Sequence, residues 1–205
     1  MIKLRFCSLA LLFLITCLGY SQNTPGWYAF HPNQEIQVHN LPPLMAKSDD
    51  PLDVLRTSLD ILFHNREICC GKDSALEDRA LAADPSSLKD IAAKLQGKHL
   101  LSDGRPIMVT ADILATSSGD ASYQIVSALV NQHAMLMAWG SHLYVLYGAI
   151  FDQTAYSDGT SMNVIHKLLL LDTRFSNSRR EVVFNRNTDD WSKVQGLLLV
   201  DAEQQ

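Results

Sequence analysis

The stretch that decides the fold consists of two apolar runs joined by two small residues: 134–139 (AMLMAW), 140–141 (GS) and 142–150 (HLYVLYGAI). A two-residue connection that contains glycine is typical of a β-hairpin, because glycine readily adopts the backbone angles of such turns. Each run also has the length of a buried strand. The stretch therefore predicts two antiparallel strands, with His142 at the start of the second.

Further strands are expected on either side of this hairpin. Residues 164–172 contain four successive leucines before Asp172, and residues 181–186 follow across a short polar turn, which indicates a second hairpin. Residues 196–200 (GLLLV) predict a last strand, and residues 107–111 predict a short earlier one. We therefore expect an antiparallel sheet in the C-terminal part of the chain.

The preceding part of the chain carries helical signals. Asp50-Pro51 is typical of an N-cap followed by a first turn, and leucines at 52, 55, 59 and 62 recur on one face up to about residue 66. Ser74 with Glu77 predicts the start of a second helix, and Asp84-Pro85 predicts a third with a stripe of Leu88, Ile91, Ala92 and Leu95. Residues 123–132 predict another helix, with Ile125, Val126, Leu129 and Val130 facing inward. The expected fold is α+β, a helical N-terminal half followed by an antiparallel sheet.

The first 21 residues have the pattern of a signal peptide. Lys3 and Arg5 precede an apolar stretch at 6–18 and the small residues Gly19 and Ser21, so we expect cleavage after Ser21 and export to the periplasm or the extracellular space. The apolar stretch is shorter than the roughly 20 residues that span a bilayer, so no stable membrane anchor is expected. Lipid attachment at Cys17 is the alternative, disfavoured because threonine precedes it.

The remaining chain is expected to form one domain. Residues 22–50 contain several prolines among polar residues and predict an extended arm, while residues 51–205 predict a single α+β domain. The formal net charge is −5, and the one basic cluster, Arg174 with Arg179 and Arg180, is too small for a nucleic-acid surface. No nucleic-acid partner is expected.

Three chemistry-bearing residues follow one another in the order thiol, imidazole, carboxylate: Cys70, His142 and Asp172. A thiol becomes a strong nucleophile when a base lies beside it and a third group orients the base. If the two hairpins pair, Asp172 could bond one nitrogen of His142 and leave the other for the thiol. Cys70 is preferred to Cys69 because it lies just ahead of a helix, whose dipole would stabilise a thiolate.

From Cys70 to about Asp172 the chain distantly resembles the papain-like cysteine peptidases, in particular the bacteriocin-leader peptidase type. The residues that carry the resemblance are Cys70-Gly71 ahead of a helix, the helix at 124–130 leading into residues 134–138, His142 opening a strand that ends in Tyr147-Gly148, and the leucine-rich strand ending in Asp172. The resemblance implies a papain-like fold, a cysteine nucleophile, a histidine base and an orienting aspartate, a peptide or protein substrate, and no cofactor.

The chain differs from that family at two positions. The family has a glutamine shortly before the cysteine, whereas residues 63–67 read FHNRE, so that Asn65 is the nearest amide donor. Its strand usually ends in Asp-Pro, whereas Thr173 follows Asp172. Transglutaminase-like folds use the same three groups in the same order, so peptidase and acyl-transfer chemistry both stay open.

Each of these residues also has a structural interpretation. Cysteine is among the most buried residue types, and a histidine that begins a strand is often a turn residue. Asp172 could cap the turn before Arg174, Arg179 or Arg180. A zinc site of His64, Cys69 and Cys70 is disfavoured because adjacent cysteines lack the usual spacing, so no metal is expected. The sequence predicts a secreted papain-like domain with thiol peptidase or acyl-transfer activity, active or degenerate; the alternative is a non-catalytic exported binding or structural domain. The oligomeric state is left open.

Overall fold

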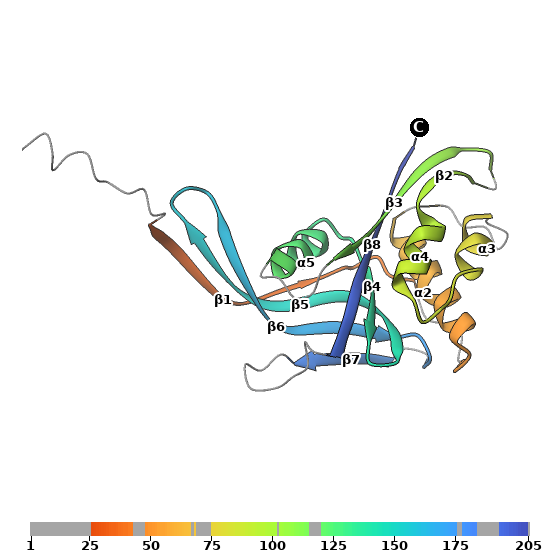
Figure 1. Ribbon diagram of the computed structural model, residues 1–205. Helices are drawn as coiled ribbons and strands as arrows, with labels where there is room; N and C mark the ends of the chain where they lie inside the picture. The colour runs from red at the N-terminus through yellow and green to blue at the C-terminus, as the bar shows by residue number, and fades with distance from the viewer. Residues whose placement is uncertain are drawn as a thin grey trace, which may run out of the picture.

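The computed structural model describes residues 26–42, 48–66, 68, 75–101, 103–114, 120–175, 178–183 and 193–204. The helices in this part of the chain are α2 (Pro51–Asn65), α3 (Ala75–Leu81), α4 (Leu88–Leu95) and α5 (Asp120–Val130). The strands are β1 (Trp27–Gln37), β2 (Gly97–Leu100), β3 (Pro106–Leu114), β4 (Met135–Trp139), β5 (His142–Tyr156), β6 (Ser161–Asp172), β7 (Ser178–Val183) and β8 (Val194–Gln204). Together they form a mixed α+β fold with one large sheet (Figure 1).

The sheet is antiparallel throughout and has the order β2-β3-β8-β4-β5-β6-β7, with β1 pairing to β5 beside this path. The hairpin predicted across Gly140 is confirmed as β4–β5, with Trp139 opposite His142 and Gly140 at φ 60°. The second hairpin is β6–β7, with Asp172 opposite Ser178. Residues 184–186 of its predicted second strand lie outside the described residues.

Both faces of the central strands are covered. All four leucines from 168 to 171 are buried, and successive residues of a strand point to opposite faces of the sheet. The run is therefore apolar throughout because it has no solvent-facing side, which explains why it lacks the alternation of a half-exposed strand.

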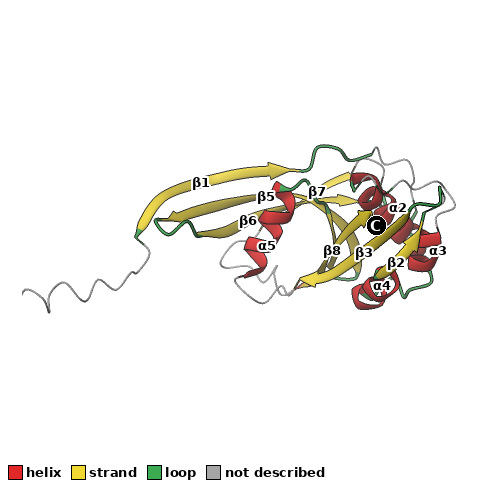
Figure 2. Cartoon of the chain, turned by 90° about the horizontal axis from the view of Figure 1, so that it is seen from above, coloured by secondary structure: helices red, strands yellow, loops and turns green. Residues whose placement is uncertain are grey.

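The segment expected to be an extended arm is a strand of the sheet. β1 pairs with the far part of β5, from Gln37 opposite Gly148 to Trp27 opposite Tyr156. β5 has 15 residues and β4 has five, so β1 continues the sheet where β4 has ended. Figure 2 shows β1, β5 and β6 running out together to one side of the molecule, away from α2, α3 and α4.

The strand β1 corrects the expected order of elements, because it precedes the helices and the N-terminal half is not simply helical. The strand is difficult to recognise from the sequence of this segment. The pairing with β5 is interrupted between His31 and Gln34, where Pro32 lacks an N–H and Asn33 has φ 50°. This irregularity breaks the alternating pattern by which strands are recognised.

The predicted helices are present, with local differences. Asp50 caps α2 by accepting a hydrogen bond from the Leu52 backbone N–H at 2.8 Å, and Leu55, Leu59 and Leu62 are buried as predicted. Leu52 is 44% exposed, contrary to the prediction, because it lies in the first turn, before the helix packs on the sheet. Of the inward positions predicted on α5, Val130 is also exposed, at the last residue of the helix.

The helix α4 begins later than its first signal. Its stripe of Leu88, Ile91, Ala92 and Leu95 is buried as predicted. The N-cap is Ser87, whose hydroxyl accepts from the Asp90 N–H at 3.2 Å. Asp84 instead accepts hydrogen bonds from the backbone and hydroxyl of Ser86 and closes the preceding turn.

Candidate functional site

Two of the three predicted site residues lie at the same end of the sheet. His142 opens β5 and is exposed, while Asp172 ends β6 and is fully buried. β5 and β6 are antiparallel neighbours with Val145 opposite Leu171, so the start of one strand lies beside the end of the other. The pairing of the two hairpins that the prediction required is therefore present.

The third predicted residue, Cys70, lies outside the described residues, as does Cys69. The described chain on one side of them stops at Ile68, whose N–H donates to the Phe63 carbonyl at the end of α2, and it resumes at Ala75. The pairing of a thiol with His142 therefore stays a prediction.

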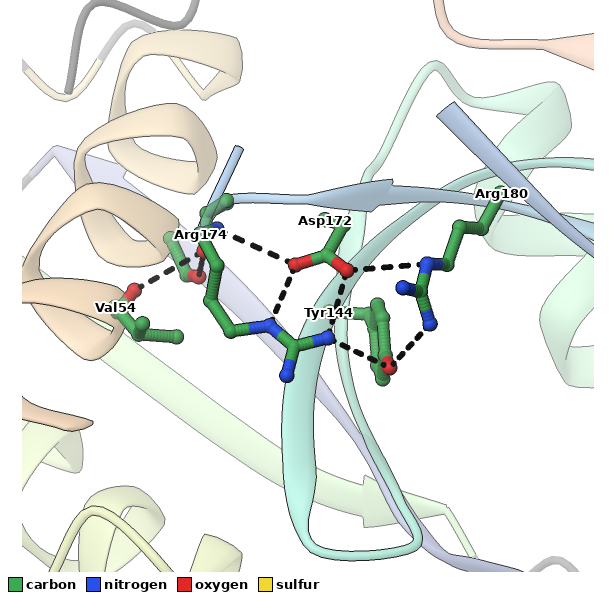
Figure 3. Close-up of polar contacts among 7 residues, drawn as sticks. Val54, Tyr144, Asp172, Arg174 and Arg180 are labelled. Carbon is green, nitrogen blue, oxygen red and sulfur yellow. Dashed lines mark hydrogen bonds and ion pairs between the residues drawn. The ribbon is translucent and has the colours of Figure 1, made fainter. Parts of the chain in front are cut away.

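The carboxylate of Asp172 is bound by two arginines. Oδ1 accepts from Nε of Arg174 at 2.8 Å, and Oδ2 accepts from Nη2 of Arg174 at 2.7 Å. Nε of Arg180 lies 3.1 Å from Oδ2. Figure 3 shows the two guanidinium groups on either side of the carboxylate. Bidentate contact of this kind is the strongest form of arginine–carboxylate pairing.

Tyr144 completes this group from the neighbouring strand. Its hydroxyl accepts from Nη2 of Arg174 at 3.3 Å and from Nη1 of Arg180 at 3.4 Å. The guanidinium carbon of Arg174 lies 5.7 Å from the centre of the Tyr144 ring, within reach of a cation–π interaction. We refer to Tyr144, Asp172, Arg174 and Arg180 as the Arg–Tyr cluster.

The arginines determine the protonation state of Asp172. Burial alone would raise the pKa of this carboxyl group, but the hydrogen bonds and charge of Arg174, together with the charge of Arg180, outweigh burial and hold the pKa below its usual value. The same contacts raise the pKa of Arg174. The cluster therefore contains two cations and one anion at neutral pH.

The end of β6 is fastened to α2 directly after Asp172. The Thr173 hydroxyl lies 3.2 Å from the Ser58 hydroxyl and donates to the Val54 carbonyl at 3.5 Å, and Ser58 and Thr173 are both buried. These contacts place the Arg–Tyr cluster beside the N-terminal half of α2 (Figure 3).

The opposite end of α2 is fastened to β4 and β8. Oδ1 of Asn65 accepts from the Ala134 N–H at 2.9 Å, and Arg66 donates twice to the Val200 carbonyl at 2.9 and 2.8 Å. Asn65 is the amide closest in sequence to the position at which the peptidase family has its glutamine. Here it links α2 to the start of β4. The side-chain oxygen of Asn65 is therefore engaged in a structural contact.

The predicted hydrogen bond between Asp172 and His142 is not among the contacts of Asp172 within the described part of the chain. Two permanent cations compete for the same oxygens, and Arg174 binds both oxygens at once, which a single imidazole N–H cannot do. The alternative that Asp172 caps a turn is confirmed, because Oδ1 also accepts from the Arg174 backbone N–H at 3.3 Å.

One member of the cluster was not predicted from sequence. The spacing of Asp172 and Arg174 suggested their contact, whereas the part played by Tyr144 depends on the register between β5 and β6. A tyrosine in a mostly aliphatic buried run was the available signal, because a buried phenol normally has a hydrogen-bond partner.

The remaining expectations concern metals and membranes. His64, of the disfavoured zinc site, is exposed on α2, and no grouping of three or more histidine, cysteine or acidic side chains suited to a metal ion occurs in the described ranges. None of the helices described here is both long and apolar enough to cross a membrane. Comparison of the chain with protein-family models, curated proteins and solved structures finds no match.

Proposed function

We propose that this protein is a non-catalytic exported binding domain built on an α+β scaffold of papain-like type. The observation that carries the proposal is the pairing of Asp172 with Arg174 and Arg180. An orienting carboxylate must accept a hydrogen bond from the imidazole of the catalytic base. In this protein both carboxylate oxygens already accept hydrogen bonds from arginine.

The energy of the Arg174 pair argues against an easy exchange of partners. The Asp172 side chain is fully buried and that of Arg174 is 12% exposed. Removing one member of a buried ion pair costs about 3–5 kcal/mol, because the other charge is left without a partner. Turning Asp172 toward His142 would leave the largely buried guanidinium of Arg174 without its carboxylate partner.

The second candidate is thiol peptidase or acyl-transfer activity of Cys70 with His142 on a peptide or protein substrate. It is favoured by one observation, which is that His142 is exposed at the sheet end where β5 and β6 meet. In this candidate the imidazole would act without Asp172 as its orienting group.

Alkylation of the thiols separates the two candidates. The mature protein, lacking residues 1–21, retains only Cys69 and Cys70 and is treated with iodoacetamide near neutral pH, beside its His142→Ala variant. We expect both proteins to react no faster than the same thiols in urea, because an inactive thiol has no neighbouring base. Faster labelling of one cysteine, slowed by His142→Ala and abolished by Cys70→Ser, would establish the thiol enzyme instead.

A further inference from the structure

The Arg–Tyr cluster has an excess of positive charge in an acidic protein. Arg174 and Arg180 share a single carboxylate, while the whole chain has a formal net charge of −5. One cationic group of the cluster therefore has no matching anion inside it. Such a local excess attracts a negatively charged group.

The two arginines use their donors differently. Arg174 directs both Nε and Nη2 to Asp172 and is 12% exposed, so it is committed to the carboxylate. Arg180 reaches Asp172 through Nε alone, and its side chain is 45% exposed. Within the described residues, its second terminal nitrogen, Nη2, has no hydrogen-bond partner. The exposed edge of Arg180 is thus the open side of the cluster.

The guanidinium of Arg180 is held in place before any ligand arrives. Nε is fixed by Asp172 at 3.1 Å and Nη1 by the Tyr144 hydroxyl at 3.4 Å. Asp172 and Tyr144 are themselves buried, so two anchored groups restrain a side chain that is otherwise flexible. Preorganisation of this kind lowers the entropy cost of binding.

From these contacts we infer that Arg180 is the anchor of a carboxylate-binding site, with Tyr144 and Asp172 as its positioning residues. A planar guanidinium matches the two oxygens of a carboxylate, and one monoanion would balance the charge of the cluster. The charge of Asp49 also contributes to the raised pKa of Arg174, so the counter-charge that Asp49 supplies acts on Arg174.

This inference names the ligand class of the proposed binding domain and rests on that function. The ligand is an exported molecule with a free carboxylate, either a small organic acid or the C-terminus of a peptide. Trp139 supplies a nearby reporter, because its ring lies 5.7 Å from that of Tyr144 and its buried Nε1 has no acceptor among the described residues.

Titration with sodium acetate at constant ionic strength tests the site, followed by the NMR signals of the Arg180 Nε–H and the Trp139 indole N–H. We expect saturable shifts in the wild-type protein and an affinity at least about tenfold lower in Arg180→Gln, as loss of one hydrogen bond to a charged group implies. Arg180→Lys keeps the charge but loses the planar fork and is expected to weaken binding as well.

Arg179→Gln is the matched control, because Arg179 is adjacent and also exposed. Its guanidinium carbon lies 5.6 Å from the centre of the Tyr147 ring. Arg179 and Arg180 pair with Leu171 and Leu170, so they point to opposite faces of β7. The control is expected to bind acetate as the wild-type protein does. Equal losses in both glutamine variants, or shifts that never saturate, would overturn the inference.

Two further ligands identify the source of the carboxylate. An acetylated dipeptide that binds more tightly than acetate supports a peptide C-terminus, whereas equal affinity supports a small organic acid; its C-terminal amide is expected not to bind. Binding of the amide as tight as that of the acid would contradict the inference. Slow thiol labelling without acetate binding would reject this site and leave the proposed non-catalytic function in place. Fast thiol labelling with acetate binding would reject the non-catalytic function and leave the site in place.

Discussion

The partners of Asp172 distinguish the catalytic interpretation of this protein from the non-catalytic one. The side chain was predicted to orient a histidine, and instead it holds two arginines and the turn that follows β6. The sequence contains both kinds of partner, His142 and the arginines. The pairing of β6 with β5 and β7 selects the arginines, because it brings Arg180 and Tyr144 to the carboxylate.

Replacing Asp172 with asparagine should destabilise the protein substantially. We expect a loss of about 3 kcal/mol in the free energy of unfolding, at the lower end of the range for buried pairs because Arg180 is open to solvent. Urea unfolding at pH 7 measures the loss. Asp103→Asn, which removes an exposed pair with Arg105, is the control and should change stability little. A small effect at both sites would contradict a structural role for Asp172.

The effect of Asp172 should depend on pH in a defined direction. Its pKa in the folded protein is below the value of about 3.9 usual for an unfolded chain, so its charge stabilises the fold above that pH. The stabilisation is lost as the pH falls through the folded pKa. The difference in unfolding free energy between the wild-type protein and Asp172→Asn should therefore shrink below about pH 4. A difference that stays constant from pH 7 to pH 3 would exclude the ion pairs as its cause.

At the level of elements, Gly148 of β5 is the position at which β1 and β6 both approach β5 closely. A Cβ atom at this position would lie 2.7 Å from the Ile36 carbonyl oxygen and 2.9 Å from a methyl group of Leu169. Gly148→Ala should therefore destabilise the protein by about 1–3 kcal/mol. Gly26→Ala is the control, because its Cβ would meet the Ser157 hydroxyl at an ordinary 3.4 Å. Thermal unfolding of both variants tests the close pairing of β1 with β5, and equal melting temperatures would refute it.

The start of α4 offers a second test at this level. Ser87→Ala removes the hydroxyl that accepts from the Asp90 N–H and should cost about 1 kcal/mol. Asp84→Ala leaves this cap in place and should affect the helix less. Urea unfolding of the two variants compares the observed cap with the one suggested by Asp84-Pro85. A larger loss in Asp84→Ala would show that the helix begins at the earlier residue.

Across the whole molecule, predictions from local pattern were better than predictions from contacts distant in sequence. The β4–β5 hairpin and the buried face of α4 follow from short-range periodicity and turn residues, and both are present. The pairing of β1 with β5 joins segments more than 100 residues apart and could not be deduced from Pro32 and its polar neighbours. Val130 shows the limit of periodicity, because a residue on the correct face is exposed where the helix ends.

The candidate site shows the same contrast between local patterns and contacts distant in sequence. The order of Cys70, His142 and Asp172 predicted that these residues converge, and the pairing of β5 with β6 brings His142 and Asp172 to one end of the sheet. The partner of Asp172 is decided by electrostatic competition among His142 on β5, Arg180 on β7 and Arg174 in the turn after β6. Local patterns contain no information about such a competition, so the sequence left both outcomes open.

A double-mutant cycle tests the partner of Asp172 most directly. Asp172→Asn is combined in turn with Arg174→Gln and with His142→Ala, and the free energy of unfolding is measured for each single and double variant. We expect a coupling energy of about 1–3 kcal/mol between Asp172 and Arg174, and one within about 0.5 kcal/mol of zero between Asp172 and His142. Strong coupling to His142 with none to Arg174 would contradict the non-catalytic interpretation and return Asp172 to the role of orienting a catalytic base.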